Sequence, residues 1–381
     1  MVGIEKSAVE SLVNPLNTFF GGVYSGKTVF ITGHTGFKGS WLALWLHSLG
    51  AHVIGFSLEP PTKPSLFETL GLSKQITHII GDVRNFDALC TEMARHQPEF
   101  VFHLAAQPLV RLSYDEPVDT FATNIMGTIN VLEAVRKTPS VRVCLCITSD
   151  KCYENREWVY AYRENDPMGG FDPYSASKGA AELVVASYRS SFFHPECYDA
   201  HQVAVATARA GNVIGGGDWA KDRIVPDIIR ALANHELVPI RNPGAIRPWQ
   251  HVLEPLSGYL LLAARMRENG RDFSSAWNFG PTATANIPVM ELAKQAVSIW
   301  GKGEIHDLSA HQKNAPHEAT FLKLDCAKAM NVLHWRPAWS VSQTISETIS
   351  WYHGYYNDPN FSARSASIAQ INAYSLVHGR F

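Results

Sequence analysis

The sequence predicts an α/β fold in which a doubly wound parallel sheet carries a smaller α+β lobe. Over residues 27–208, short apolar runs alternate with segments of helical period, which is typical of a parallel sheet with helices on both faces. A glycine-rich turn joins the first apolar run to the first helical segment. After residue 208 the alternation stops, and loops rich in glycine, proline and arginine follow. We therefore expect a nucleotide-binding sheet with a second lobe attached to it.

Composition excludes several classes of function. The 381 residues carry a formal net charge of -2, so no bulk attraction to nucleic acid or to a membrane surface is expected. No apolar run is long enough to span a bilayer. The six cysteines show no CxxC pair and no metal-ligand spacing, which predicts no metal site and fits a reducing cytoplasm. Residues 1–26 lack the basic start and apolar core of a secretory signal, and we expect an extension that packs on the body or on another subunit.

The glycine turn has the form of a dinucleotide cradle. Residues 27–32 predict a strand, and a helix with a wide apolar face follows and ends at Gly50. We expect Gly33 to form the tight turn, Gly36 to let backbone amides approach a diphosphate, and Gly39 to let the helix pack on the strand. Thr35 and Phe37 lie in the same turn. Strand, turn and helix together predict a Rossmann-type sheet.

The next three strands complete the predicted cofactor site. The second, 52–56, ends at Ser57, where an acid would normally hold the ribose hydroxyls. Glu59 is a substitute or a solvated loop residue, and since no arginine lies beside Ser57 to receive a 2′-phosphate, NAD is favoured over NADP. The third strand, 79–83, and the fourth, 100–106, end in the remaining candidate contacts: Asp82, Val83, Leu104, Ala105 and Ala106.

The predicted catalytic residues come from two stretches. Ser149, Asp150 and Lys151 follow a buried fifth strand at 141–147, at the sheet edge where ligands usually bind. Tyr174 and Lys178 lie one helical turn apart after Pro173. The pKa of a tyrosine is about 10, and we expect the lysine cation and an oxidised nicotinamide to lower it. A surface tyrosine and lysine is the alternative, against which the upstream cradle and Ser149 argue.

The second lobe is predicted to bind an anionic sugar derivative. A sixth strand, 203–208, leads to Asn212, and Arg223 and Arg247 then lie among glycines and a tryptophan, a setting that suits a phosphate-bearing ligand. Surface arginines are the alternative, strongest for Arg241. We expect a NAD-binding domain at 27–208 with a return of about 251–281, and a substrate-binding domain at 209–250 and 282–381. Helices are predicted near 253–267, 287–300, 325–333 and 341–353, and a strand near 277–279.

Several longer runs resemble a known family. They lie at 32–39, 105–111, 148–153, 209–219, 246–252 and 322–325. The chain after residue 26 resembles the extended short-chain dehydrogenase/reductase superfamily of NAD-dependent sugar epimerases and dehydratases, and specifically its CDP-glucose 4,6-dehydratases. The glycine turn and Y-x-x-x-K are superfamily-wide, whereas S-D-K-C-Y and G-G-G-D-W are far more restrictive.

The resemblance implies a lyase of deoxysugar and lipopolysaccharide biosynthesis that converts CDP-D-glucose to CDP-4-dehydro-6-deoxy-D-glucose and water. Hydride would pass from C4 to NAD and return to C6. Tyr174, assisted by Lys178 and Ser149, would take the C4 hydroxyl proton, and Asp150 would protonate the departing C6 hydroxyl. Lys151 would be the C5 base, or would stay charged and steady the enolate while water takes the proton.

The resemblance also implies binding residues and partners. The substrate-binding set is Arg111, Asn124, Asn212, Arg223 and Arg247, in which Asn212 and Arg223 meet the phosphates, Arg247 pairs with the diphosphate, and Asn124 orients the Lys178 region through water. A cytoplasmic homodimer would form through helices near 117–137 and 173–193.

Two other functions remain open from the sequence. A nucleotide-sugar 4-epimerase would share Tyr174 and Lys178 but would not need Asp150 and Lys151. A non-catalytic NAD-binding sensor or scaffold would tend to lose the tyrosine or the lysine, and this chain keeps both.

Overall fold

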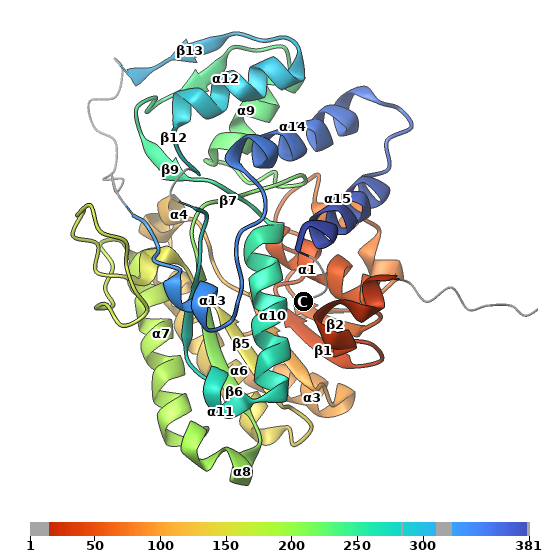
Figure 1. The fold of residues 1–381 in the computed structure, drawn as a ribbon, viewed down its shortest axis with the longest axis vertical. Coiled ribbons are helices and arrows are strands. Elements are labelled where there is room, and N and C mark those ends of the chain that lie inside the picture. Colours follow the sequence, from red (N-terminus) through yellow and green to blue (C-terminus); the bar gives the residue numbers. More distant parts are fainter. Residues whose placement is uncertain (1–14, 283–284, 310–321, 379–381) are drawn as a thin grey trace, which may run out of the picture.

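A seven-stranded parallel sheet forms the centre of the computed structural model, which describes residues 15–282, 285–309 and 322–378 (Figure 1). The spatial order is β11-β6-β5-β4-β1-β2-β3, so the chain winds outward in both directions from β1 and β4. The predicted fold class is confirmed. Such a reversal of strand order creates a crevice at the carboxyl edge where ligands bind. The strands are β1 Thr28–Thr32, β2 His52–Ser57, β3 Thr77–Ile80, β4 Phe100–His103, β5 Val143–Ile147, β6 Ala204–Ala210 and β11 Ala276–Phe279.

Apolar layers cover both faces of this sheet. Successive side chains of a strand point to opposite faces, so Val29 and Ile31 enter one core while Phe30 enters the other. Because both faces are buried, the strands read as nearly continuous apolar runs. Helices α1 Phe37–Ser48, α10 Leu253–Glu268 and α15 Ala363–His378 contribute to the first core, and α3 Phe86–His96, α6 Gly127–Lys137 and α7 Pro173–Ser191 contribute to the second.

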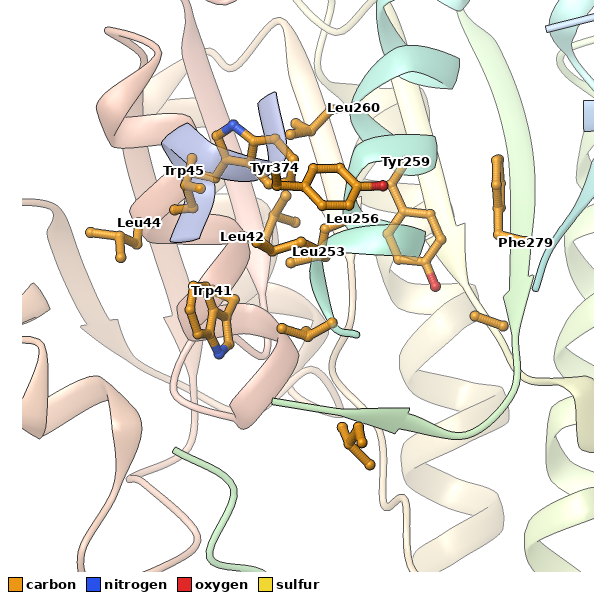
Figure 2. Close-up of a cluster of buried hydrophobic side chains, with 14 of the residues drawn as sticks. Trp41, Leu42, Leu44, Trp45, Leu253, Leu256, Tyr259, Leu260, Phe279 and Tyr374 are labelled. Atoms are coloured by element: carbon orange, nitrogen blue, oxygen red, sulfur yellow. The ribbon is translucent and has the colours of Figure 1, made fainter. Parts of the chain in front are cut away.

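The packing of α1 against α10 fixes the helix that follows the glycine turn. Figure 2 shows Trp41, Leu42 and Trp45 of α1 facing leucines of α10, with Tyr374 of α15 beside them. The described part of the N-terminal extension also packs here, because Tyr24 is 1% exposed and its hydroxyl donates to the Leu260 carbonyl at 2.5 Å. Residues 1–14 of the predicted extension lie outside the described residues.

The second lobe gathers at one end of the sheet (Figure 1). Its helices are α9 Ile224–Ala233, α12 Val289–Trp300 and α14 Val341–Asn357, and short strand pairs join its loops: β8 Val238–Ile240 with β13 Ile305–Asp307, β9 Ile246–Pro248 with β12 Asn286–Pro288, and β7 Val213–Ile214 with β10 Gln250–His251. Shorter helices connect the elements: α2 Leu66–Thr69, α4 Val110–Asp115, α5 Pro117–Phe121, α8 Tyr198–His201, α11 Gly270–Phe273 and α13 Ala327–Asn331. No helix within the described ranges is both long and apolar enough to cross a membrane.

Several element boundaries differ from those predicted. Strand β3 ends at Ile80, because the Asp82 side chain accepts from the Arg84 backbone N–H at 2.8 Å and turns the chain out of the sheet. Strand β4 ends at His103, so Leu104 begins an extended loop. The helix predicted at 117–137 is broken by a π-helical segment at Ala122–Met126. Helix α15 was not predicted.

A buried carboxyl group holds α15 and the 338–339 segment on α10. Glu254 is 1% exposed and accepts hydrogen bonds from the Trp339 N–H at 2.7 Å and the Tyr374 hydroxyl at 2.6 Å. Burial raises the pKa of Glu254 to about 7, although the hydrogen bonds from Tyr374, Trp339 and Ala338 act to lower it. The folded protein therefore keeps a proton at Glu254 that the unfolded chain releases above its ordinary pKa of 4.5.

This raised pKa makes stability depend on pH. Between about pH 4.5 and 7 the folded state binds more protons than the unfolded state, so the free energy of unfolding contributed by Glu254 falls as the pH rises through this window, by about 3 kcal/mol in total. Glu254→Gln should flatten that slope in urea unfolding at a series of pH values. Glu268→Gln, at the exposed end of the same helix, is the control and should leave the slope unchanged. An unaltered slope in Glu254→Gln would contradict the assignment.

Candidate active site

The β1–α1 turn is as closely packed as its glycines predict. Gly33 has a φ of +77°, and a Cβ added there would lie 2.6 Å from the Ala105 backbone nitrogen. A Cβ at Gly39 would lie 2.1 Å from the Gly33 carbonyl oxygen, so only glycine lets α1 approach the turn. Gly36 is less crowded, with its nearest neighbour at 3.4 Å, and lies immediately before α1. The first N–H groups of a helix lack intrahelical acceptors and bind anions.

Hydroxyl groups occupy the place where an acid would hold a ribose. The Thr35 hydroxyl contacts the Ser57 hydroxyl at 2.8 Å and donates to the Leu58 carbonyl at 2.9 Å. Glu59, the possible substitute, is exposed. Beyond it, Asp82 forms an ion pair with Arg84 at 2.6 Å, and Val83 is buried against α6.

A chain of hydrogen-bonded side chains, Thr32, His103 and Thr128, fixes the backbone that follows β4. The Thr32 hydroxyl contacts His103 Nδ1 at 2.7 Å and accepts from the Ala105 N–H at 3.2 Å. The other ring nitrogen of His103 contacts the Thr128 hydroxyl at 3.1 Å. The segment from Leu104 to Ala106 is thereby held beside the glycine turn.

The turn after β5 places an acid in a buried position. Ser149 caps a short 3-10 helix over Asp150–Cys152, since its hydroxyl accepts from the Lys151 N–H at 3.2 Å and donates to Asp150 Oδ1 at 3.0 Å. Burial raises the pKa of Asp150 above its ordinary value, while Lys151, the Ser149 hydrogen bond and Lys38 oppose the rise. A Cβ at Gly211 would lie 2.8 Å from Asp150 Oδ2, so the end of β6 stays clear of this acid.

Tyr174 and Lys178 are both buried on α7, whose first turn is capped by Asp172. Burial raises the pKa of Tyr174 to about 12; the hydrogen bond to Ser149 and the charge of Arg223 lower it, and Asp150 raises it. Burial lowers the pKa of Lys178 to about 8. The sequence led us to expect a lowered tyrosine pKa. In the structure the desolvation of the phenol outweighs the nearby positive charge.

A buried ion pair supports this part of the site. Glu182 and Arg209 meet through two hydrogen bonds, at 2.9 and 2.8 Å, and each side chain is 4% exposed. The same carboxylate accepts from the Thr148 hydroxyl and, at 2.8 Å, from the Thr207 hydroxyl. Burial alone would raise the pKa of Glu182, but Arg209 and these hydroxyls hold it below its usual value. Sequence reasoning missed Glu182, although it continues the four-residue spacing of Tyr174 and Lys178.

Asn124 lies in the π-helical segment and is 2% exposed. Its side chain accepts from the Gln107 N–H at 2.9 Å and donates to the Gln107 carbonyl at 3.1 Å and to the Ser177 hydroxyl at 2.8 Å. The Ser177 hydroxyl in turn donates to the Tyr174 carbonyl at 2.7 Å. Asn124 therefore links the loop after β4 to the helix that carries Tyr174.

The predicted arginines are spread along the opening of the site. Arg223 pairs with Asp218 at 2.8 Å and is close enough to Tyr174 to influence its pKa. Arg111 of α4 and Arg241 of the second lobe both contact Asp222, at 3.1 and 3.5 Å.

The remaining predicted binding residues lie on the second lobe's side of Asp150. Arg247 is on β9, where it donates to the Ile246 carbonyl at 3.1 Å, and Asn212 lies between β6 and β7. A cavity of about 140 Å³ reaches Asp150 and is lined in part by Gly211, Pro248 and Lys323.

Lys38 is a charged group that sequence reasoning missed. It lies between Gly36 and Gly39 at the start of α1, and the sequence analysis assigned it no role. Burial lowers its pKa to about 8, helped by the charges of Arg223 and Lys178 and opposed by Asp150. Lys38 thus joins Lys151, Lys178 and Arg223 as a cation of the site.

A family model described as GDP-mannose 4,6 dehydratase matches residues 30–348. The chain belongs to the GDP-mannose 4,6 dehydratase family. One relative of this family member, the CDP-glucose 4,6-dehydratase of Salmonella typhimurium, is 53% identical over 332 residues, which cover 87% of this chain and 92% of the relative. A dTDP-glucose 4,6-dehydratase of Xanthomonas campestris is 26% identical and covers 85% of this chain and 93% of its own. The resemblance predicted from the sequence is confirmed.

Solved structures share the fold of this family member at low identity. The dTDP-glucose 4,6-dehydratase of Streptomyces venezuelae, with NAD and TYD bound, superposes with a TM-score of 0.71 at 21% identity and covers 87% of this chain and 99% of its own. The UDP-glucose 4-epimerase of Thermotoga maritima gives a TM-score of 0.71 at 22% identity and covers 86% and 99%. The fold therefore does not separate dehydratases from epimerases.

The close packing at Gly39 can be tested against the less crowded Gly36. Gly39→Ala should destabilise the protein by about 3 kcal/mol or prevent folding, because the new methyl group overlaps the Gly33 carbonyl. Gly36→Ala is the matched control in the same turn and should cost about 1 kcal/mol at most. Urea unfolding measures both. Equal losses in the two variants would show that close packing is not what requires Gly39.

Proposed function

We propose that the chain is an NAD-dependent CDP-glucose 4,6-dehydratase that converts CDP-D-glucose to CDP-4-dehydro-6-deoxy-D-glucose and water. The observation that carries this proposal is the 53% identity, over 332 residues, with a protein named CDP-glucose 4,6-dehydratase. The site supports it, since the buried acid Asp150 accepts a hydrogen bond from the Ser149 hydroxyl at 3.0 Å, Lys151 follows in the chain, and Tyr174 and Lys178 are both buried on α7.

The residues at the β1–α1 turn fit a bound dinucleotide. The close-packed Gly33 and Gly39 leave the start of α1 beside an open Gly36, and Lys38 adds positive charge suited to a diphosphate. Thr35 and Phe37 would complete this contact. The adenosine half would lie along Asp82, Val83 and the segment from Leu104 to Ala106, and the nicotinamide half would lie near Tyr174 and Lys178. Bound NAD would accept a hydride from C4 of the sugar and return it to C6.

Tyr174 is the base for the C4 hydroxyl in this proposal. Its phenolate must form in a buried place that raises the pKa to about 12, so positive charge has to offset desolvation. Arg223 and the Ser149 hydrogen bond already act in that direction, and the positive ring of an oxidised nicotinamide would add to them. Lys178, buried one turn away, would help to position the ring and the phenol.

Asp150 is the acid for the departing C6 hydroxyl. Burial raises the pKa of Asp150 above its ordinary value, and a shift in this direction suits a general acid. Lys151, next along the chain, would remove the C5 proton once C4 is a ketone, or would remain charged and stabilise the enolate while water takes the proton. In either role Lys151 would lie beside C5 of the sugar, and Asp150 would remain the acid that protonates the C6 hydroxyl.

The second lobe would hold the nucleotide diphosphate. We assign the domain boundaries predicted from the sequence. Arg223 and Asn212 would meet the phosphates, Arg247 would pair with the diphosphate, Arg111 would also bind substrate, and Asn124 would orient the Lys178 region of α7. Loss of one desolvated arginine contact should weaken binding by about 2–5 kcal/mol. Asp222, which contacts Arg111 and Arg241, would compete with the substrate phosphates for the same cations.

The proposed protein would act in the cytoplasm as a homodimer. The exposed apolar side chains of the described helices fit the dimer. Val118, Met126 and Leu183 are 79, 50 and 62% exposed on adjoining stretches of α5, the π-helical segment and α7. A second copy of the chain would cover them.

A 4-epimerase is the second candidate function, because a solved UDP-glucose 4-epimerase has the same fold as this chain. It needs no acid at C6, and the buried Asp150 therefore favours dehydration.

The fate of a label at C4 tests the proposed reaction. CDP-glucose deuterated at C4 should lose one water, and the deuterium should be found at C6 of the product by mass spectrometry and NMR, because hydride transfer stays within one active site. A product of unchanged mass and altered stereochemistry would indicate epimerisation. An unreacted substrate would indicate a binding protein.

Two variants should separate the steps. Tyr174→Phe should lower turnover by at least about 100-fold, since the C4 proton loses its acceptor, while NAD binding measured by calorimetry stays within about 3-fold. Lys151→Ala should oxidise C4 but stall there, so that a 4-keto sugar still carrying its C6 hydroxyl accumulates in quenched samples. If Lys151→Ala instead releases water at the normal rate, Lys151 has neither of the two proposed roles.

A further inference from the structure

Tyr153, the last residue of the S-D-K-C-Y run, has a buried hydroxyl group that links the chain after Lys151 to two strands of the sheet. The side chain is 1% exposed. Its hydroxyl accepts a hydrogen bond from Arg209 Nη1 of β6 at 2.6 Å and donates one to Asn278 Oδ1 of β11 at 2.8 Å. Burial raises the pKa of this hydroxyl, so it keeps its proton and remains a donor at neutral pH. The proposed reaction gives Tyr153 no part.

The ring of Tyr153 is held by contacts that do not involve the hydroxyl. The guanidinium carbon of Arg209 lies 4.9 Å from its ring centroid, and the Tyr162 ring stacks on it with a centroid distance of 5.1 Å and an interplanar angle of 23°. A phenylalanine at this position would keep both ring contacts and lose only the two hydrogen bonds. The hydroxyl can therefore be removed while the packing of the ring is kept.

The backbone is fixed on both sides of Lys151. On one side, the Lys151 N–H donates to the Ser149 hydroxyl at 3.2 Å. On the other side, the Cys152 carbonyl accepts from the Gly169 N–H at 2.8 Å, and Tyr153 follows at once. Lys151 therefore lies in a turn, the 149–153 turn, whose start is held by Ser149 and whose end is held by Tyr153.

The Lys151 side chain depends on the backbone of this turn for its position. Among the described residues, the Lys151 ammonium group forms no hydrogen bond or ion pair. The Asp150 carboxyl group, by contrast, accepts from the Ser149 hydroxyl at 3.0 Å and lies against Gly211. A displacement of about 1 Å at a reacting group can lower a rate by about 100-fold. Loosening the end of the turn should therefore affect Lys151 more than Asp150.

We propose that Tyr153 is a positioning residue that fixes the end of the 149–153 turn and thereby places Lys151 for the step at C5 of the sugar. Its hydroxyl links the turn to β6 and β11, and the buried side chain acts through Lys151 without touching the substrate. This inference rests on the proposed function and adds to it a role for the last residue of the S-D-K-C-Y run.

Removal of the Tyr153 hydroxyl should slow one step of the reaction and spare another. In single-turnover rapid-quench measurements with NAD and CDP-glucose, Tyr153→Phe should form the 4-keto sugar within about 3-fold of the wild-type rate but lose water roughly 10- to 100-fold more slowly. CDP-glucose deuterated at C5 should show a larger isotope effect on water loss in this variant than in the wild type, because removal of the C5 proton becomes the slow step. The ratio of the two rates does not depend on the fraction of folded protein, so a loss of stability does not imitate this result.

Two controls show whether the effect passes through Lys151. Tyr162→Phe removes a hydroxyl from the neighbouring ring of the same stack, where it accepts from the Arg156 N–H at 2.7 Å and donates to Asn155 Oδ1 at 3.1 Å, and it should leave both rates unchanged. In a Lys151→Ala background, Tyr153→Phe should cause no further slowing of the residual water loss, because two residues that act through one group are not additive.

The outcomes distinguish positioning from a general structural role. Equal slowing of both steps in Tyr153→Phe would overturn the proposal and leave Tyr153 as a structural residue. Water loss at the wild-type rate, or a further slowing in the Lys151→Ala background, would overturn it as well. If the wild type itself releases no water from CDP-glucose, the proposed function fails and this inference fails with it, whereas a working wild type with any of the other three results removes this inference alone.

Discussion

The buried ion pair between Glu182 and Arg209 joins α7 and the end of β5, which carry the reacting groups, to β6. Glu182 lies on α7, two turns beyond Tyr174, Arg209 lies on β6, and the same carboxylate binds Thr148 at the end of β5. Arg209 also donates to the Tyr153 hydroxyl at 2.6 Å, which extends the network to the segment after the catalytic turn. Removing one partner from such a pair leaves an unpaired buried charge, typically a loss of about 3–5 kcal/mol. The distance between Ser149 and Tyr174 therefore depends on a contact that touches neither of them.

Burial then sets the chemistry of the groups held in this way. Desolvation raises the pKa of Asp150 and Tyr174 and lowers that of Lys178 and Lys38, so acids hold their protons longer and amines release theirs more readily. The raised pKa makes the Asp150 carboxyl group better suited to act as an acid, and two of the site's ammonium groups have pKa values of about 8. The shift of the Tyr174 phenol does not suit its role as a base, because burial moves its pKa further above neutral pH. The positive charge of a ligand would be needed to lower that pKa again.

The second lobe contributes arginines to the site, of which Arg223 acts on Tyr174 and Arg241 is exposed. Asp222 contacts Arg111 from α4 and Arg241 from the second lobe through the same carboxylate oxygen. These cations are exposed, and their ion pairs with Asp222 are therefore weak in water. An anionic ligand of higher charge could replace Asp222 at little cost. The exposed arginines are therefore suited to binding an anionic ligand, and the buried groups at the carboxyl edge of the sheet are suited to proton transfer.

The sequence by itself determined the alternation of strands and helices, the glycine turn and the placement of Tyr174 and Lys178 on one helix face, because each is encoded by a local period or by a fixed spacing. It also placed Ser149 and Asp150 at the end of a strand. Tertiary structure alone decided where β3 ends, how α15 packs on α1, and that Lys38 faces Asp150. It also decided the pairing of Glu182 with Arg209, residues 27 positions apart on different elements. The direction of the Tyr174 pKa shift belongs to the same group, since desolvation depends on every atom that surrounds the phenol and no local pattern in the chain records it.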